Sequence, residues 1–233
     1  MISRASGTAG CLVALVIILN ASTSAQERPS PYPKMEPLDQ YLMTDRDAEI
    51  TLARSSAPDA ISRDAKVLVL GKHGYETAVE GKNGWVCVVE RAWTSPFDSA
   101  EFWNPRIRGA MCFNPPAVRF ILPITYKRTE LALSGLSKSE IMDQMRAAYR
   151  RKELPAFEAG GVSYMLSKQA YLTDRGDHNL AHLMFYVPPG TDWAGDLPNS
   201  PVMLGVESNA ATPFRMFLVP VSRWSDGTAA PVE

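Results

Sequence analysis

The three histidines carry the most distinctive chemistry in this sequence. His178 and His182 lie four positions apart, Asp177 directly precedes them, and His73 lies far upstream. Residues four apart share one face of a helix or a strand. Imidazole and carboxylate groups bind zinc, which takes three or four protein ligands, and they also act as general bases. The spacing predicts a candidate metal site at Asp177, His178 and His182, and candidate catalytic roles for His73, His178 and His182.

The same histidines also have a simpler interpretation. Gly176 interrupts the segment and an apolar run follows His182, a pattern typical of a loop that enters a strand. No nucleophile stands beside these residues, and the sequence lacks the standard hydrolase, zinc-protease, dinucleotide and phosphate-loop motifs. The alternative to a catalytic or metal site is therefore that the histidines lie exposed in loops. In that case the hydrogen bonds of His182 would be satisfied at the edge of a sheet.

A second candidate site is the long connection over residues 91–108. It contains Trp93 and Trp103 together with Glu101 and Arg106. Long loops in compact domains are often functional, and Trp and Arg are well suited to hold planar, sugar-like or peptide ligands. The sequence therefore predicts ligand binding at Trp93, Glu101, Trp103 and Arg106. The alternative is a lid of aromatic side chains that packs over a sheet.

The beginning of the chain has the pattern of a secretory signal peptide. A short polar start with Arg4 precedes an apolar run over 11–19 and small residues over 21–25. The apolar run is shorter than the roughly 20 residues that span a bilayer. The pattern predicts a signal peptide over 1–25, cleaved after Ala25, and an exported protein, periplasmic or secreted, that does not insert stably into a membrane.

Cysteine usage agrees with export. Cys11 falls within the predicted signal peptide, which leaves Cys87 and Cys112 as an even pair for an oxidising compartment. A bridge between them would close a span of 112 − 87 = 25 residues. The sequence has no C-x-x-C, so a redox role is disfavoured. The pair predicts a structural disulfide, and two separate buried thiols are the alternative.

Composition bounds the class of protein. Lys and Arg number 24 and Asp and Glu 25, so nucleic acid is disfavoured as a partner because it would select a basic excess. A hydrophobic fraction of 45% excludes a disordered chain. The domain prediction is a signal peptide over 1–25, a proline-rich leader over 26–37 that is extended and mobile, and a single domain over 38–233.

Periodicity and turn signals predict the elements of that domain. A helix is expected over 39–55, and strands over 67–70, 75–79 and 85–90 are separated by the turns 71–74 and 81–84, which indicates an antiparallel meander. Asn114-Pro115 begins a helix that breaks near Pro123, and Ser137 with Glu140 forms a capping box. Further strands are expected over 162–166, 182–187, 202–206 and 215–219.

This order of elements predicts the α+β class. The expected architecture is an antiparallel meander sheet covered by helices on one side. A profilin-like or PAS-like sandwich has a similar order, which is an analogy of fold alone.

Five stretches resemble a family of uncharacterised, hypothetical exported bacterial proteins with no assigned activity. They cover residues 41–50, 67–79, 81–87, 101–105 and 112–116, and residues 182–185 are similar too. The resemblance extends over most of the chain after the signal peptide. It implies an exported, free-standing domain, and it implies neither an activity nor catalytic residues.

Three functions compete on the sequence alone. The first is an exported soluble domain that binds a small molecule or a protein partner through the aromatic loop, residues 91–108. The second is a periplasmic hydrolase-type enzyme that uses His73, His178 and His182, with or without a metal. The third is a structural protein of the cell envelope. No cofactor is indicated by any motif.

Overall fold

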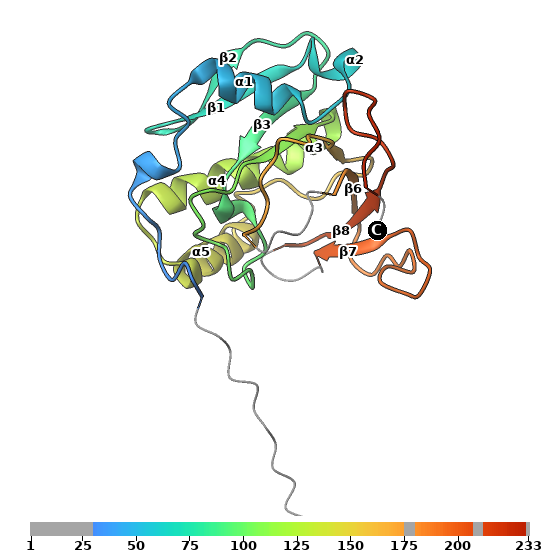
Figure 1. Ribbon diagram of the computed structural model, residues 1–233. Helices are drawn as coiled ribbons and strands as arrows, with labels where there is room; N and C mark the ends of the chain where they lie inside the picture. The colour runs from blue at the N-terminus through green and yellow to red at the C-terminus, as the bar shows by residue number, and fades with distance from the viewer. Residues whose placement is uncertain (1–29, 175–179, 207–211, 232–233) are drawn as a thin grey trace, which may run out of the picture.

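The computed structural model describes residues 30–174, 180–206 and 212–231, and the predicted signal peptide lies outside these ranges. Within them, one mixed sheet of eight strands has the order β2-β1-β3-β4-β5-β6-β8-β7 (Figure 1). The α+β class is confirmed. The strands are β1 (Lys66–Gly71), β2 (Gly74–Val79), β3 (Val86–Glu90), β4 (Gly109–Phe113), β5 (Val162–Met165), β6 (His182–Val187), β7 (Met203–Val206) and β8 (Arg215–Pro220).

The helices follow their capping signals closely. Asp45 caps α1 by accepting the backbone N–H groups of Asp47 and Ala48, so the helix begins later than residue 39, where it was expected. None of the helices within the described ranges has the length and apolarity needed to cross a membrane. The helices are η1 (Leu38–Gln40), α1 (Arg46–Arg54), α2 (Asp59–Ser62), η2 (Ala92–Thr94), α3 (Pro115–Phe120), α4 (Leu122–Leu133) and α5 (Lys138–Arg150).

Two predicted helix starts after β4 are confirmed. Asn114 accepts the N–H of Ala117 at 3.1 Å and caps α3, and the helix breaks just before Pro123. Ser137 and Glu140 form the expected capping box at the start of α5. These local signals place α3, α4 and α5 in succession between β4 and β5.

The first three strands do not form the predicted antiparallel meander. β1 and β2 form an antiparallel hairpin, but β3 pairs with the opposite edge of β1 and runs parallel to it. The segment before β3 crosses the beginning of β1, where the N–H of Lys66 donates to Trp85 O at 2.9 Å. A Cβ on Gly81 would lie 2.2 Å from Lys66 N, so this close crossing requires glycine.

Burial explains why β1 is a central strand. Residues 67–70 of β1 are all buried, whereas the middle of β2 is exposed. A continuous apolar run is typical of a strand that is covered on both faces and paired on both edges. The exposed β2 therefore forms the edge of the sheet, and β3 takes the inner position beside β1.

Helices cover both faces of the sheet, rather than the one face predicted. The main core joins α3, α4 and α5 to one face, and Leu68 and Val88 of the sheet belong to it. On the opposite face Leu52 and Ala53 of α1 pack on Val67 and its neighbours in a smaller core. The prediction failed because alternate residues of β1 and β3 are apolar on both sides, and each side needs a cover.

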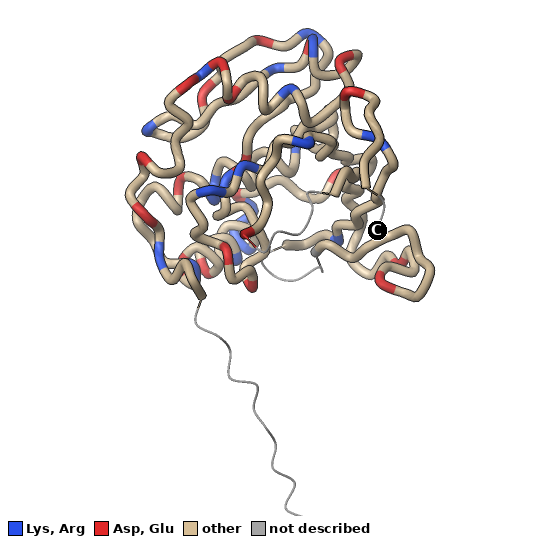
Figure 2. The backbone as a smooth tube through the Cα atoms, in the orientation of Figure 1, with Lys and Arg blue, Asp and Glu red and all other residues tan. Residues whose placement is uncertain are grey.

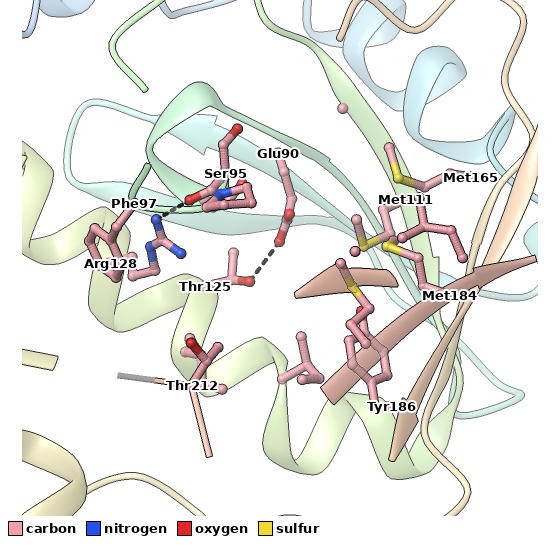
Figure 3. A pocket seen from close by; sticks show the side chains of 18 of the residues that line it. Glu90, Ser95, Phe97, Met111, Thr125, Arg128, Met165, Met184, Tyr186 and Thr212 are labelled. Carbon is pink, nitrogen blue, oxygen red and sulfur yellow. Dashed lines mark hydrogen bonds between the residues drawn. The ribbon is translucent and has the colours of Figure 1, made fainter. Parts of the chain in front are cut away.

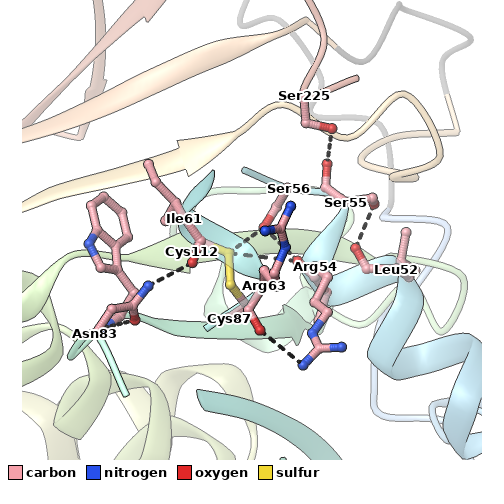
Figure 4. Close-up of a disulfide and its surroundings, with 12 residues drawn as sticks. Leu52, Arg54, Ser55, Ser56, Ile61, Arg63, Asn83, Cys87, Cys112 and Ser225 are labelled. Atoms are coloured by element: carbon pink, nitrogen blue, oxygen red, sulfur yellow. Dashed lines mark hydrogen bonds between the residues drawn. A yellow bond between two sulfur atoms is a disulfide. The ribbon is translucent and has the colours of Figure 1, made fainter. Parts of the chain in front are cut away.

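The predicted disulfide joins Cys87 of β3 to Cys112 of β4, which lie directly opposite in the sheet (Figure 4). It belongs to the smaller core beneath α1, where the hydroxyl of Ser56 donates to Cys112 Sγ at 3.1 Å. The bridge holds together the two strands from which residues 91–108 extend.

The described part of the proline-rich leader is held against the body rather than mobile. Ser30 Oγ donates to Ala100 O at 2.5 Å, and the phenol of Tyr32 donates to the carboxylate of Asp174. Tyr32 and Met35 also pack against the main core. Apolar and aromatic side chains between the prolines provide contacts that outweigh the tendency of such a segment to stay free.

A buried ion pair links α1 to the sheet. Arg91 NH2 lies 2.8 Å from Glu49 Oε1, and the two side chains are 0% and 2% exposed. Arg91 also donates to Tyr41 O and Val89 O, while the N–H of Leu70 donates to Glu49 Oε1 at 3.1 Å. The pair is therefore hydrogen-bonded on both sides, as a buried pair must be.

Removing one partner of this pair should strongly destabilise the fold. We expect Glu49→Ala to lower the free energy of unfolding by about 3–5 kcal/mol, because Arg91 would stay buried without its counter-ion. Urea denaturation measures the loss. The control is Glu76→Ala, whose ion pair with Arg46 is exposed and whose loss should cost less than about 1 kcal/mol. Equal losses in the two variants would contradict the role given to the buried pair.

The disulfide makes an independent contribution. We expect the double variant Cys87→Ala/Cys112→Ala to lose about 3 kcal/mol of stability, because the unfolded chain regains the freedom of the closed span. Thermal unfolding with and without reductant checks this. Reductant should destabilise the wild type and leave the double variant unchanged, and an unaffected wild type would refute the prediction.

Candidate functional site

A cavity of about 890 Å³ lies between the sheet and the helices that follow β4 (Figure 3). Four adjacent strands, β4, β5, β6 and β8, form its floor. Its other walls come from α4, α5 and the beginning of loop 91–108. This is the same face of the sheet that α3, α4 and α5 cover.

Strand alternation determines which side chains form the floor. Every second residue of a strand faces the same side, so β4, β6 and β8 each contribute alternating positions. Five of the ten methionines of the chain are among the described lining residues. Methionine is flexible and polarizable and adapts to ligands of irregular shape. The floor includes Met111 and Phe113 of β4, Met165 of β5, His182, Met184 and Tyr186 of β6, and Met216 and Leu218 of β8.

Helix periodicity likewise defines the wall from α4. Residues 121, 124, 125 and 128 line the cavity, and this spacing places them on one face of the helix. From α5 the lining residues are Met142 and Arg146, one turn apart. The wall is apolar except for Thr125 and the two arginines, Arg128 and Arg146.

Arg128 is a buried cation at the edge of this cavity. It is 7% exposed, donates to Ser95 O, and its guanidinium lies 4.3 Å from the centre of the Phe97 ring. Burial lowers the pKa of Arg128 to about 10, so it stays charged at neutral pH. Its Nε has no hydrogen-bond partner among the described residues.

Glu90 is a buried carboxyl group in the same cavity. Its Oε1 accepts the hydroxyl of Thr125 at 2.6 Å. Burial raises the pKa of Glu90, while hydrogen bonds from Thr125 and Thr94 and the charge of Arg128 oppose the rise. In Figure 3 the guanidinium of Arg128 lies between Phe97 and the Thr125–Glu90 pair.

His182 is the one predicted catalytic residue that lines the cavity in the described structure. Its Nδ1 lies 2.6 Å from Leu180 O, and because a carbonyl only accepts, Nδ1 carries the proton and Nε2 keeps a lone pair. Burial lowers the pKa of His182. The ring is therefore neutral at pH 7 and can accept a proton or a hydrogen bond.

Of the other predicted histidine-site residues, the described structure places only His73, and it lies far from His182. His73 lies exposed in the turn between β1 and β2, and β3, β4 and β5 separate β1 from β6. Four strand spacings amount to roughly 19 Å. Asp177 and His178 lie outside the described residues. Across the described ranges no group of three His, Cys, Asp or Glu residues could hold a metal ion.

The two tryptophans of the loop are buried in the main core and do not line the cavity. Trp93 Nε1 donates to Thr129 Oγ1 of α4 at 3.0 Å, and its ring packs at 5.0 Å from that of Tyr41. Trp103 packs edge-on against Phe102 at 4.7 Å. These side chains fix the loop against α4, the helix that carries Arg128.

Glu101 and Arg106 belong to a polar cluster outside the cavity, centred on Asp174. Arg106 lies 2.5 Å from the Asp174 carboxylate, and Asn104 donates to both Glu101 and Asp174. Tyr32 and Tyr171 also donate to Asp174. Burial alone would raise the pKa of Asp174, but hydrogen bonds from Tyr32, Tyr171 and Asn104 lower it to about 2. The cluster fastens the leader and the loop to the segment before residue 175.

The sequence analysis missed Arg128, Glu90 and the methionine floor. A basic residue within an apolar face of a predicted helix was an available signal, since Arg128 follows Ile121, Ile124 and Thr125 at helical spacing. The strand methionines gave no signal by themselves, because apolar residues at alternate positions predict a core equally well.

Comparison with known proteins adds no assignment. No family model matches the chain, and neither the curated proteins nor the solved structures contain a significant match. The resemblance to uncharacterised exported proteins stays a prediction.

The Asp174 cluster predicts a defined dependence of stability on pH. The folded pKa of about 2 lies below the unfolded value near 3.9. The carboxylate therefore stabilises the fold above about pH 4 and loses this contribution as the pH falls toward 2. We expect Asp174→Asn to cost about 1–2 kcal/mol at pH 7.

Urea denaturation at several pH values tests this expectation. The difference between wild type and Asp174→Asn should shrink between pH 4 and pH 2. Asp39→Asn, an exposed substitution, is the matched control and should show no such convergence. A difference that stays constant down to pH 2 would contradict the assignment of the pH dependence to Asp174.

Proposed function

We propose that this protein is an exported binding protein that holds a small, predominantly apolar molecule in the cavity between the sheet and α4. The observation that carries this proposal is the cavity itself, about 890 Å³ in volume and lined mainly by methionine, isoleucine, leucine and aromatic side chains. Binding pockets for small molecules measure about 300–1,000 Å³ and combine apolar walls with a few polar groups.

Loop 91–108 contributes to the proposed site differently from the sequence prediction. Its backbone and side chains over residues 94–98 form part of the cavity wall. Trp93 supports that wall from behind by packing between the loop and α4. The contribution of Trp103, Glu101 and Arg106 is indirect. They hold the loop in position but do not line the cavity. A rigid wall favours affinity because less freedom is lost on binding.

Export is part of the proposal. The signal-peptide pattern over 1–25 is its main support. The disulfide between Cys87 and Cys112 is compatible with an oxidising compartment such as the periplasm or the cell exterior. A free-standing domain with a ligand cavity fits a binding protein better than a purely structural envelope protein. The profilin-like or PAS-like sandwich remains an analogy within this proposal.

A hydrolase is the second candidate, and one observation favours it. His182 lines the cavity with a neutral ring whose Nε2 can act as a base. Glu90 lies in the same cavity and could act as an acid–base partner. Binding is favoured over catalysis because the described lining offers apolar contacts around most of the volume, whereas His73 lies across the sheet from His182.

Filling the cavity should abolish binding of an apolar probe. Nile red is neutral and fluoresces strongly in apolar surroundings, so we expect the purified protein to bind it in a one-to-one ratio. Met184→Trp places a larger side chain in the cavity and should weaken Nile red binding at least about tenfold, or 1.4 kcal/mol. Fluorescence titration measures both affinities.

The matched control is Met203→Trp on the edge strand β7, where the side chain is exposed and outside the cavity lining. It should bind Nile red as the wild type does. Circular dichroism verifies that both variants are folded. Equal weakening in the two variants, or no binding by the wild type, would overturn the proposed function.

A further inference from the structure

Arg128 places an incompletely satisfied positive charge at the cavity. One terminal nitrogen donates to Ser95 O, and the guanidinium faces the ring of Phe97. Its Nε is buried and has no partner among the described residues. A buried guanidinium normally uses its fork of donors fully, because unmade hydrogen bonds in a dry interior are costly.

The charge of Arg128 also lacks a close counter-ion. Within the described ranges no carboxylate oxygen lies within 4.0 Å of a guanidinium nitrogen of Arg128. Glu90 lines the same cavity, but its Oε1 is engaged by the hydroxyl of Thr125. Burying a cation without a paired anion is strongly unfavourable. An anionic group in the cavity would supply what the side chains of the described residues do not.

Arg146 strengthens this argument from a neighbouring helix. It also lines the cavity, and its Nε is buried without a partner in the described structure. Among the described residues Arg146 forms one ion pair, a long one of 3.4 Å to the exposed Asp143. Figure 2 shows Lys and Arg positions gathered where α4 and α5 lie. Two arginines on adjacent helices give the cavity a positive side.

Most of the remaining lining is apolar, although Glu90, Asp98 and His182 also lie in it. Figure 3 shows Met111, Met165 and Met184 gathered on the opposite side from Arg128, Ser95 and Phe97. A ligand that satisfies both sides must carry one anionic end and one apolar body. The planar guanidinium matches the two oxygens of a carboxylate, which can accept two parallel hydrogen bonds.

We propose that the ligand of this cavity is an amphiphilic carboxylate, with its carboxylate bound by Arg128 and its apolar chain lying along the methionine floor. This inference rests on the proposed function, because it names the chemical class of the molecule that the cavity holds. Arg146 supports the carboxylate by its charge, and Phe97 keeps the Arg128 guanidinium in place.

The test compares an acid with its neutral ester. Decanoate and methyl decanoate have the same apolar chain, and each is used to displace Nile red from the purified protein at pH 7.5. We expect decanoate to bind at least about tenfold more tightly than the ester. In Arg128→Gln the affinity for decanoate should fall to that for the ester, and the affinity for the ester should stay unchanged.

Two further variants separate the charge from its surroundings. Arg128→Lys keeps the charge but loses the fork, so it should retain part of the preference for the acid. Lys127→Gln removes a cation from the same helix at a position outside the cavity lining and should leave both affinities unchanged. If Arg128→Gln does not fold, the comparison of acid and ester on the wild type decides the question alone.

The outcomes distinguish this inference from the proposed function. Equal affinities for acid and ester on the wild type would overturn the carboxylate assignment and leave the apolar binding site standing. Binding of Nile red without displacement by either decanoate or the ester would also overturn it. Failure of the wild type to bind Nile red would overturn the proposed function, and the present inference with it.

Discussion

The buried guanidinium of Arg91 holds together three segments of the first half of the fold, namely the chain before α1, α1 itself and the end of β3. It donates to Tyr41 O before α1, to Val89 O in β3 and to Glu49 in α1. Glu49 in turn accepts the N–H of Leu70 in β1. One ion pair thereby fixes α1 over the parallel strands β1 and β3, and it does so at the residue where loop 91–108 begins. The pair therefore also fixes the point at which the loop leaves the sheet.

From this point the loop is fastened at each stage of its course. The disulfide joins β3 and β4, the two strands that the loop connects. Trp93 donates a hydrogen bond to α4, and Asp174 binds Asn104 and Arg106 of the loop. Each contact is modest by itself, of the order of 1 kcal/mol for a hydrogen bond. Together they keep the cavity wall in one geometry, so little ordering of the loop would oppose ligand binding.

Local signals in the sequence were sufficient for most elements, but not for their pairing. The caps at Asn114 and Ser137 act within one helical turn, so sequence alone predicts them. The order of β1, β2 and β3 depends on which strand is buried on both faces, and on a glycine crossing at Gly81 that is visible only in three dimensions. The candidate site has the same limit, because Glu90, Arg128 and His182 come from three separate elements. Sequence singled out His182, which lines the cavity, and its catalytic role stays a prediction. Sequence also assigned Trp93 and Trp103 to ligand binding, whereas the structure places both rings in the main core.

The two buried arginines of this protein show how a structural charge differs from a binding charge. Arg91 has a carboxylate at 2.8 Å and carbonyl acceptors for its remaining donors, so its electrostatic requirements are met within the chain. Arg128 is nearly as deeply buried, yet among the described residues it has one carbonyl acceptor, an aromatic ring and an Nε without a partner. Desolvation penalises both charges, and only Arg91 recovers that cost from its neighbours. Replacing Arg91 should therefore be detected as a loss of stability, whereas Arg128 should matter most when the cavity holds an anion.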